Sequence, residues 1–182
     1  ARQRRWIFSA GFVAAGIVVV TTASSTPVFA AAAAVLAMGL YPLRRSMQYV
    51  RWGVVGAAVF VHFIKEQPAW HVLAQISAVG GSTGWHRYNL IDNFITHLPD
   101  WWINGVRSTA YWGYGQQDVT NQYVLEGVTG GLVTFVLFMA VIASAFVLIG
   151  RTLRRNAGNQ VIEVYAWTLG AILFVHCMAF LG

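Results

Sequence analysis

Long apolar runs alternate with short polar stretches along this chain, and the length of the runs indicates their environment. A helix that spans a membrane needs about 20 predominantly apolar residues. Five runs reach or approach that length, at residues 6–22, 27–43, 47–64, 128–150 and 161–181. They predict an all-α, polytopic membrane protein with about five transmembrane helices. The third run is the least regular, because Arg51 must extend its side chain towards the lipid headgroups.

The polar stretch between the third and fourth runs, residues 65–118, has a periodicity of its own. Within it, residues 85–98 carry apolar side chains at intervals of three and four, which predicts an amphipathic helix. A glycine-rich turn precedes this helix, and Pro99 is expected to stop it. The chain therefore divides into three helices in residues 1–64, a long loop in 65–118 and two helices in 119–182.

The arginines predict the orientation of these helices. Most of them lie in three clusters beside the apolar runs, namely Arg2, Arg4 and Arg5, then Arg44, Arg45 and Arg51, and finally Arg151, Arg154 and Arg155. Such clusters stay on the cytoplasmic side of a membrane. We therefore expect a cytoplasmic amino terminus and place residues 65–118 on the opposite side of the membrane, outside the cytoplasm.

Composition supports the same class. The chain is 57% hydrophobic and 10% charged, with a mean hydropathy of +0.57, whereas a soluble domain is about 25% charged. The net charge of +6 lies mainly in the three clusters, so it reflects membrane orientation and not binding to nucleic acid. A single cysteine, Cys177, excludes an intrachain disulfide. The chain starts without methionine and stops directly after an apolar run, so we expect it to be part of a longer protein.

Arg87 falls on the apolar stripe of the expected amphipathic helix, in line with Ile91 and Leu98. One interpretation is that its side chain extends to the phosphates of lipid headgroups. The other is that it is a fixed cation, which binds a substrate phosphate through the two-pronged geometry that only arginine supplies. The spacing favours neither interpretation.

Two histidines lie on a neighbouring stripe of the same helix. His86 and His97 are eleven residues apart and have no third ligand in register, so we predict no metal site. They are candidates for a general base, a hydrogen-bond donor or simple interfacial residues. The loop also holds many tryptophans, which typically lie at the membrane interface.

A polar stripe opens the fourth apolar run. Its members recur at intervals of four, four and three residues, namely Asp118, Gln122, Glu126 and Thr129. Ionisable groups at membrane depth are functional candidates, but the stripe is equally compatible with a hydrated helix end above the bilayer. The neighbouring glycines, Gly127, Gly130 and Gly131, indicate close packing or a bend.

Three short strings, GGSTGWHRYNLID at 80–92, WWING at 101–105 and DVTNQY at 118–123, resemble the O-antigen polymerase and ligase family. The likeness implies the later part of a protein with many spans and a large periplasmic loop in the bacterial inner membrane. It also implies glycosyl transfer from an undecaprenyl-diphosphate-linked saccharide to a saccharide or lipid acceptor, without a cofactor or an essential metal.

The resemblance also suggests site residues. Arg87 matches the family arginine that precedes a leucine by three residues, and the resemblance makes it the anchor of the diphosphate. The further candidates for substrate binding are Trp85, Arg107 and Asn121. Many members have His-Asn where this chain has Thr120-Asn121. The general base therefore stays open among four residues, which are His86, His97, Asp118 and Glu126.

Two other functions remain. A transporter or flippase would bind the same ligand without making a bond, and a catalytically silent assembly protein would only dock its loop on the membrane. Transport favours polar groups or broken helices near the middle of the bilayer. Here the polar residues gather at the expected outer interface, which favours an enzyme.

Overall fold

The computed structural model describes residues 2–22, 24–64 and 83–182, and within these ranges the chain is helical and has no strand. The long helices are α1 (Arg2–Thr21), α2 (Ser25–Gly39), α3 (Met47–Ile64), α5 (Thr83–Thr96), α7 (Gln122–Arg155) and α8 (Gln160–Ala179). The short ones are η1 (Tyr41–Leu43), α6 (Leu98–Trp101) and η3 (Ala110–Trp112). The expected all-α class is confirmed for this part of the chain.

Three of the described helices, α3, α7 and α8, are long and apolar enough to cross a membrane. The apolar part of α1 (Trp6–Thr21) and α2 are shorter. The fifteen residues of α2 extend about 22 Å, compared with about 30 Å for the hydrocarbon core. Its expected range of 27–43 was too long at the carboxyl end, because Pro42 has no N–H to continue the helix and the chain turns into η1.

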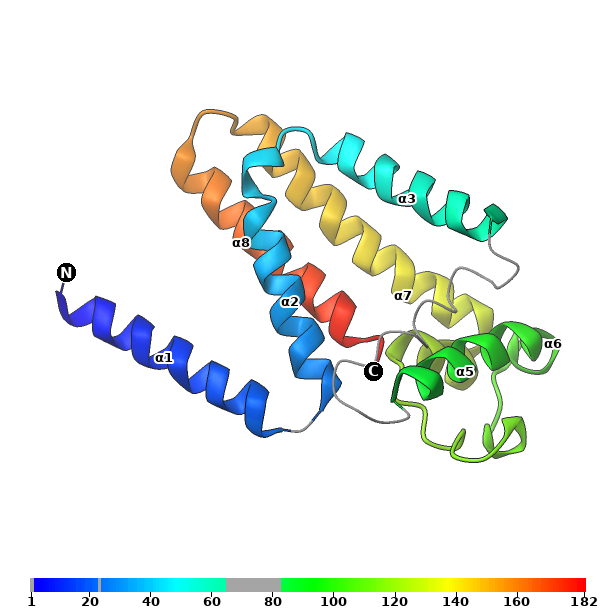
Figure 1. Cartoon of the computed structure of the whole chain (residues 1–182). Helices are drawn as coiled ribbons and strands as arrows, with labels where there is room; N and C mark the ends of the chain where they lie inside the picture. Colours follow the sequence, from blue (N-terminus) through cyan, green and yellow to red (C-terminus); the bar gives the residue numbers. More distant parts are fainter. Residues whose placement is uncertain (1, 23, 65–82) are drawn as a thin grey trace.

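Helices α2, α7 and α8 lie side by side, whereas α1 and α3 diverge from them (Figure 1). The diverging helices expose large apolar side chains to their surroundings. Phe12 on α1 is 84% exposed and Phe63 on α3 is 83% exposed. Such surfaces fit lipid and not water, in agreement with a membrane protein.

The contact between α2 and α8 is built from small residues. Ala33 and Ala37 on α2 and Ala166 on α8 are buried, so the two backbones approach closely. The indole N–H of Trp167 donates to the carbonyl of Ala37 at 3.0 Å. Small side chains at such a contact let two helices pack without large side chains between them.

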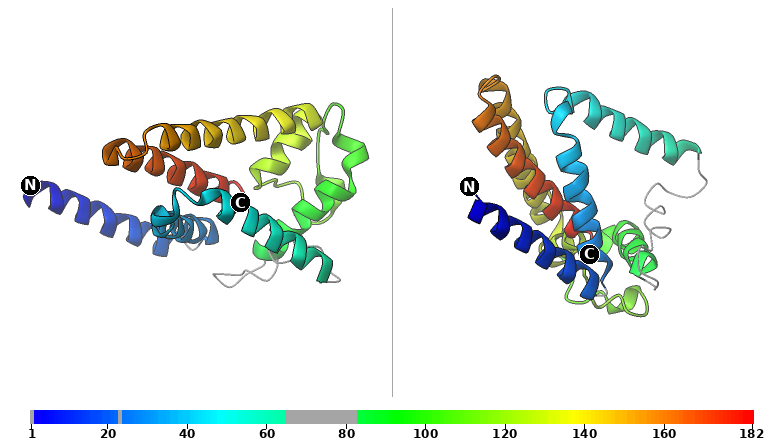
Figure 2. Two further views of the ribbon diagram at one scale, coloured as in Figure 1. Left: turned by 90° about the horizontal axis from the view of Figure 1, so that it is seen from above. Right: turned by 60° about the vertical axis from the view of Figure 1, so that its left-hand side comes forward.

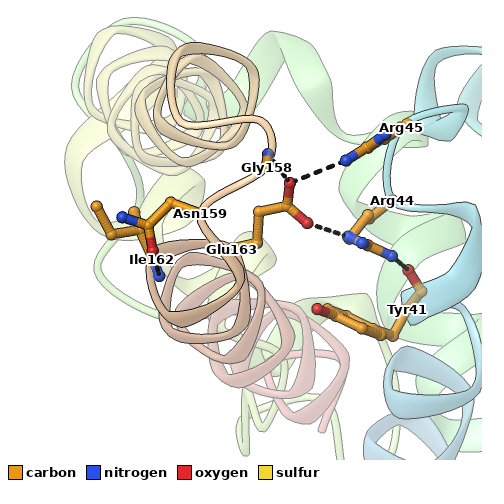
Figure 3. Close-up of polar contacts among 7 residues, drawn as sticks. All are labelled: Tyr41, Arg44, Arg45, Gly158, Asn159, Ile162 and Glu163. Atoms are coloured by element: carbon orange, nitrogen blue, oxygen red, sulfur yellow. Dashed lines mark hydrogen bonds and ion pairs between the residues drawn. The ribbon is translucent and has the colours of Figure 1, made fainter.

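A buried carboxylate ties α8 to the segment that follows η1, beyond the end of α2 (Figure 3). Glu163, in the first turn of α8, accepts from Arg44 Nε at 2.7 Å and Arg45 Nη2 at 3.2 Å. It also accepts from the backbone N–H of Gly158 at 2.8 Å. The second arginine cluster and the loop after α7 are therefore held at the same end of the bundle.

The two arginines around Glu163 are expected to differ in their effect on stability. The Arg44 side chain is 21% exposed and that of Arg45 is 67% exposed, and water screens an exposed pair. Arg44→Ala should lower the melting temperature of the purified protein clearly more than Arg45→Ala does. Equal losses in the two variants would contradict this assignment of the buried pair.

Helix α7 begins at Gln122 and is broken at Gly131, which has φ of 74° and ψ of −175°. Figure 2 shows the change in direction near the start of this helix. The loop between α6 and α7 supplies backbone partners at the break. The N–H of Val106 donates to the carbonyl of Val128 at 2.6 Å, and the N–H of Leu132 donates to the carbonyl of Trp102 at 2.9 Å. The loop is thereby fixed against α7 through its backbone.

The amphipathic helix expected at 85–98 is present as α5, although it starts earlier and ends at Thr96. Pro99 does not end α5 but lies in the first turn of α6, where a missing N–H costs nothing. Phe94 of α5 stacks on Trp101 of α6 with ring centroids 4.0 Å apart, and both pack against α7. A Cβ on Gly127 would collide with both rings, which confirms the close packing expected there.

Candidate functional site

Arg87 lies inside the protein, where α5 meets the start of α2. The residue is 4% exposed, and Leu90, one turn later, is fully buried. Its Nη2 donates to Thr26 Oγ1 of α2 at 3.1 Å, and its Cζ lies 5.2 Å from the centroid of the Phe29 ring. The guanidinium thus points at α2 instead of extending along the surface of the molecule.

This buried charge has no carboxylate partner among the described residues, and its Nε has no hydrogen-bond partner there. Burial lowers the pKa of the Arg87 guanidinium from its ordinary value. Arginine nevertheless remains protonated at neutral pH. An uncompensated buried cation is costly, so this position is suited to an anionic ligand.

An apolar groove of about 310 Å³ lies further along α5, where this helix faces α7 and the end of α8. It is lined by Ile91, Phe94, Ile95, Asn121, Tyr123, Val124, Phe135 and Leu181. Ile91 and Phe94 follow Arg87 by about one and two helical turns. The same short helix therefore carries both the buried cation and one wall of the groove.

His86 faces the segment before α7. Its Nε2 lies 3.3 Å from the backbone carbonyl of Asp118, whose side chain is exposed. A nitrogen that donates to a carbonyl must carry the proton, so this contact leaves Nδ1 of a neutral ring free to accept one. The structure thus brings His86 close to Asp118. In the sequence, His86 lies between Trp85 and Arg87.

His97 occupies a different place, at the junction of α5 and α6. Its Nδ1 lies 3.0 Å from the carbonyl of Asn93, and its ring stacks on Trp112 at 5.3 Å. The Tyr111 ring meets it edge-on, and the Tyr111 hydroxyl donates to Asp100 at 3.0 Å. His97 is therefore part of an aromatic cluster, and no contact joins it to His86 within the described residues.

Asn121 is the amino-terminal cap of α7. It is 1% exposed, its side-chain oxygen accepts from the N–H of Val124 at 3.2 Å, and its Nδ2 donates to the carbonyl of Leu181 at 3.4 Å. Both ends of the amide are therefore occupied in holding α7 to the end of α8. An asparagine directly before a helix is a sequence signal for this role.

The polar stripe is helical only from Gln122 onwards, because Asp118 lies in the preceding turn. Gln122 Nε2 donates to Glu126 Oε1 at 2.8 Å, and the Thr129 hydroxyl donates back to the carbonyl of Leu125 at 2.7 Å. Glu126 is half-buried. The Glu126 carboxylate therefore lies about one turn before the break in α7, and its hydrogen-bond partner, Gln122, is uncharged.

The two remaining candidates are exposed. Arg107 forms no hydrogen bond or ion pair with the rest of the described chain, and nothing joins it to Arg87. Trp85 is 54% exposed, with its ring 5.2 Å from that of Tyr88. Within the described ranges, no three histidine, cysteine, aspartate or glutamate side chains are grouped to hold a metal ion.

The partners of Arg87 on α2 are the residues that sequence reasoning missed. Thr26 and Phe29 lie about sixty positions earlier, and no periodicity links them to α5. Comparison of the chain with protein-family models, curated proteins and solved structures finds no match.

Proposed function

We propose that this protein transfers a glycosyl group from an undecaprenyl-diphosphate-linked saccharide to a saccharide or lipid acceptor at the outer face of the bacterial inner membrane. The observation that carries the proposal is the buried guanidinium of Arg87, which has no carboxylate partner in the described part of the chain. A diphosphate supplies the missing negative charge and accepts two parallel N–H bonds from arginine.

The reaction needs charge stabilisation and one proton transfer. The acceptor hydroxyl oxygen attacks the anomeric carbon, the bond from that carbon to the diphosphate oxygen breaks, and the diphosphate leaves with the electron pair. Arg87 stabilises the charge that develops on the leaving group. A base takes the hydroxyl proton, and His86 is the best-placed candidate because it adjoins Arg87 and its Nδ1 is free.

The apolar groove supports a lipid-linked donor. Its lining is almost entirely hydrocarbon and aromatic, and it lies on the same helix as Arg87. A polyprenyl chain loses no hydrogen bond when it leaves the membrane for such a surface. We assign the groove to the isoprenoid units next to the diphosphate.

Transport is the competing function, because broken helices are typical of transporters. The position of the break in α7 argues against it. Residues 132–155 after Gly131 form a helix about 36 Å long, which is enough to cross the hydrocarbon core of about 30 Å. This length supports a position of the break near one boundary of the bilayer, and not at its middle.

A reconstituted reaction separates these functions. The full-length protein in lipid nanodiscs receives an undecaprenyl-diphosphate-linked oligosaccharide and an acceptor, without metal or nucleotide sugar. We expect a new glycosidic bond and free undecaprenyl diphosphate, both measured by mass spectrometry. Movement of intact donor across vesicle membranes, without any new bond, would instead support transport.

A further inference from the structure

We propose that Arg87 and the first turn of α2 form the two walls of one phosphate-binding site. This inference rests on the proposed function for the role of Arg87 and adds residues that the sequence did not indicate. The anchor is the bond from Arg87 Nη2 to Thr26 Oγ1 at 3.1 Å, which places the guanidinium against the start of α2.

The first turn of a helix has N–H groups without partners inside the helix. In α2 the preceding residue, Ser24, does not cap them, because its side chain makes no bond to the helix. These amides and the aligned peptide dipoles give the start of α2 a partial positive charge. Arg87 adds a full positive charge beside it, through the direct contact with Thr26. The two like charges repel each other, and an anion bound to both relieves that repulsion.

Two further polar atoms at this junction have no partner in the described structure. The first is the hydroxyl of Ser25, the first residue of α2, which is only 4% exposed. The Nε of Arg87 is equally buried and unpaired. A buried donor without an acceptor is costly, and both donors find one in a phosphate oxygen.

The number of donors favours phosphate over a carboxylate. The guanidinium edge, the Ser25 hydroxyl and the α2 amides approach from two separate elements. A phosphate group offers more acceptor oxygens than the two of a carboxylate, and helix starts bind phosphate readily. A diphosphate on a lipid carrier and a free inorganic diphosphate share this chemistry.

Ser25→Ala is the test variant, and Ser24→Ala is its matched control, because Ser24 is the exposed neighbour without a capping bond. If the Ser25 hydroxyl is buried without contacting the ligand, Ser25→Ala leaves ligand binding unchanged. If it binds phosphate, Ser25→Ala weakens binding about tenfold, while the melting temperature without ligand stays the same or rises. Thr26→Val provides a second variant on the same turn.

Binding is measured by calorimetry on the full-length protein in phosphatidylcholine nanodiscs, with inorganic diphosphate in one arm and undecaprenyl diphosphate in the lipid of the other. We expect Arg87→Ala to abolish binding, Ser25→Ala and Thr26→Val to weaken it, and Ser24→Ala to leave it unchanged. Saturable binding of inorganic diphosphate alone identifies a soluble anion as the ligand. Binding of undecaprenyl diphosphate alone identifies the lipid carrier as the ligand. Either result supports the site.

Two outcomes separate this inference from the proposed function. If Arg87→Ala loses binding while Ser25→Ala and Thr26→Val bind as Ser24→Ala does, the shared site is overturned and the role of Arg87 in transfer survives. If all three variants lose binding but the native protein forms no glycosidic bond, the phosphate site stands and the glycosyl transfer is overturned.

Discussion

Arg87→Ala is expected to reduce glycosyl transfer by about 100-fold or more, which is the loss seen when a donor to a developing negative charge is removed. Arg87→Lys should remain strongly impaired, because a lysine ammonium keeps the charge but cannot form two parallel N–H bonds to a diphosphate. The rate of formation of the lipid-linked or acceptor-linked product in nanodiscs is the measurement.

Loss of activity in a buried-residue variant must be separated from loss of the fold. Arg87→Met retains much of the side-chain volume and removes a buried charge that has no carboxylate partner in the described structure. We therefore expect it to be inactive with an unchanged or higher melting temperature. Arg155→Ala, at an exposed position in α7, is the matched control and should keep full activity. Full activity in both Arg87→Ala and Arg87→Met would exclude a role for Arg87 with the diphosphate.

Gly131→Ala is expected to have the largest effect on stability, about 3 kcal/mol or more. The backbone angles at Gly131 are accessible essentially to glycine alone, which accounts for about 1–3 kcal/mol. A Cβ there would also collide with the backbone carbonyl of Ile103, which cannot move without breaking the contact between the loop and α7. The free energy of unfolding, measured by chemical denaturation in mixed micelles, checks this expectation.

Gly150→Ala on the same helix is the control for this prediction. Its new Cβ would lie 3.6 Å from Arg154 Nη1, an ordinary contact, and alanine is the better helix former. Stability should be unchanged or slightly higher. Gly105→Ala, whose Cβ would meet the carbonyls of Val128 and Thr129 across the same break, should lose stability as Gly131→Ala does. Similar stability of Gly131→Ala and Gly150→Ala would show that the break is not needed.

The helical framework was predictable because apolar runs and their polar separators reflect the length and solvation of each helix. Local signals also indicated close packing or a bend in α7, and the structure has both: close packing at Gly127 and a change in direction at Gly131. The premature end of α2 follows from Pro42, which is a local cause that the length of the apolar run obscured. In each of these cases the signal lies within a few residues along the chain.

The surroundings of the candidate site were not predictable in the same way. Helical periodicity places Arg87 on the apolar face of α5, and the structure agrees, but periodicity does not tell which helix that face contacts. The partner is the first turn of α2, through Thr26 and Phe29. Likewise Asn121 was a substrate-binding candidate, whereas the structure occupies both ends of its amide with α7 and α8. Contacts between distant segments decide both cases.

The side of the membrane on which the loop lies is tested most directly by cysteine labelling in intact cells. Cys177 is first replaced by alanine, and single cysteines are then introduced at Tyr114, which is fully exposed in the loop, or at Ala157, which is exposed between α7 and α8. A maleimide that cannot cross membranes should label position 114 from outside the inner membrane and position 157 only after permeabilisation. Labelling of position 157 from outside, with position 114 protected, would contradict the proposed periplasmic site.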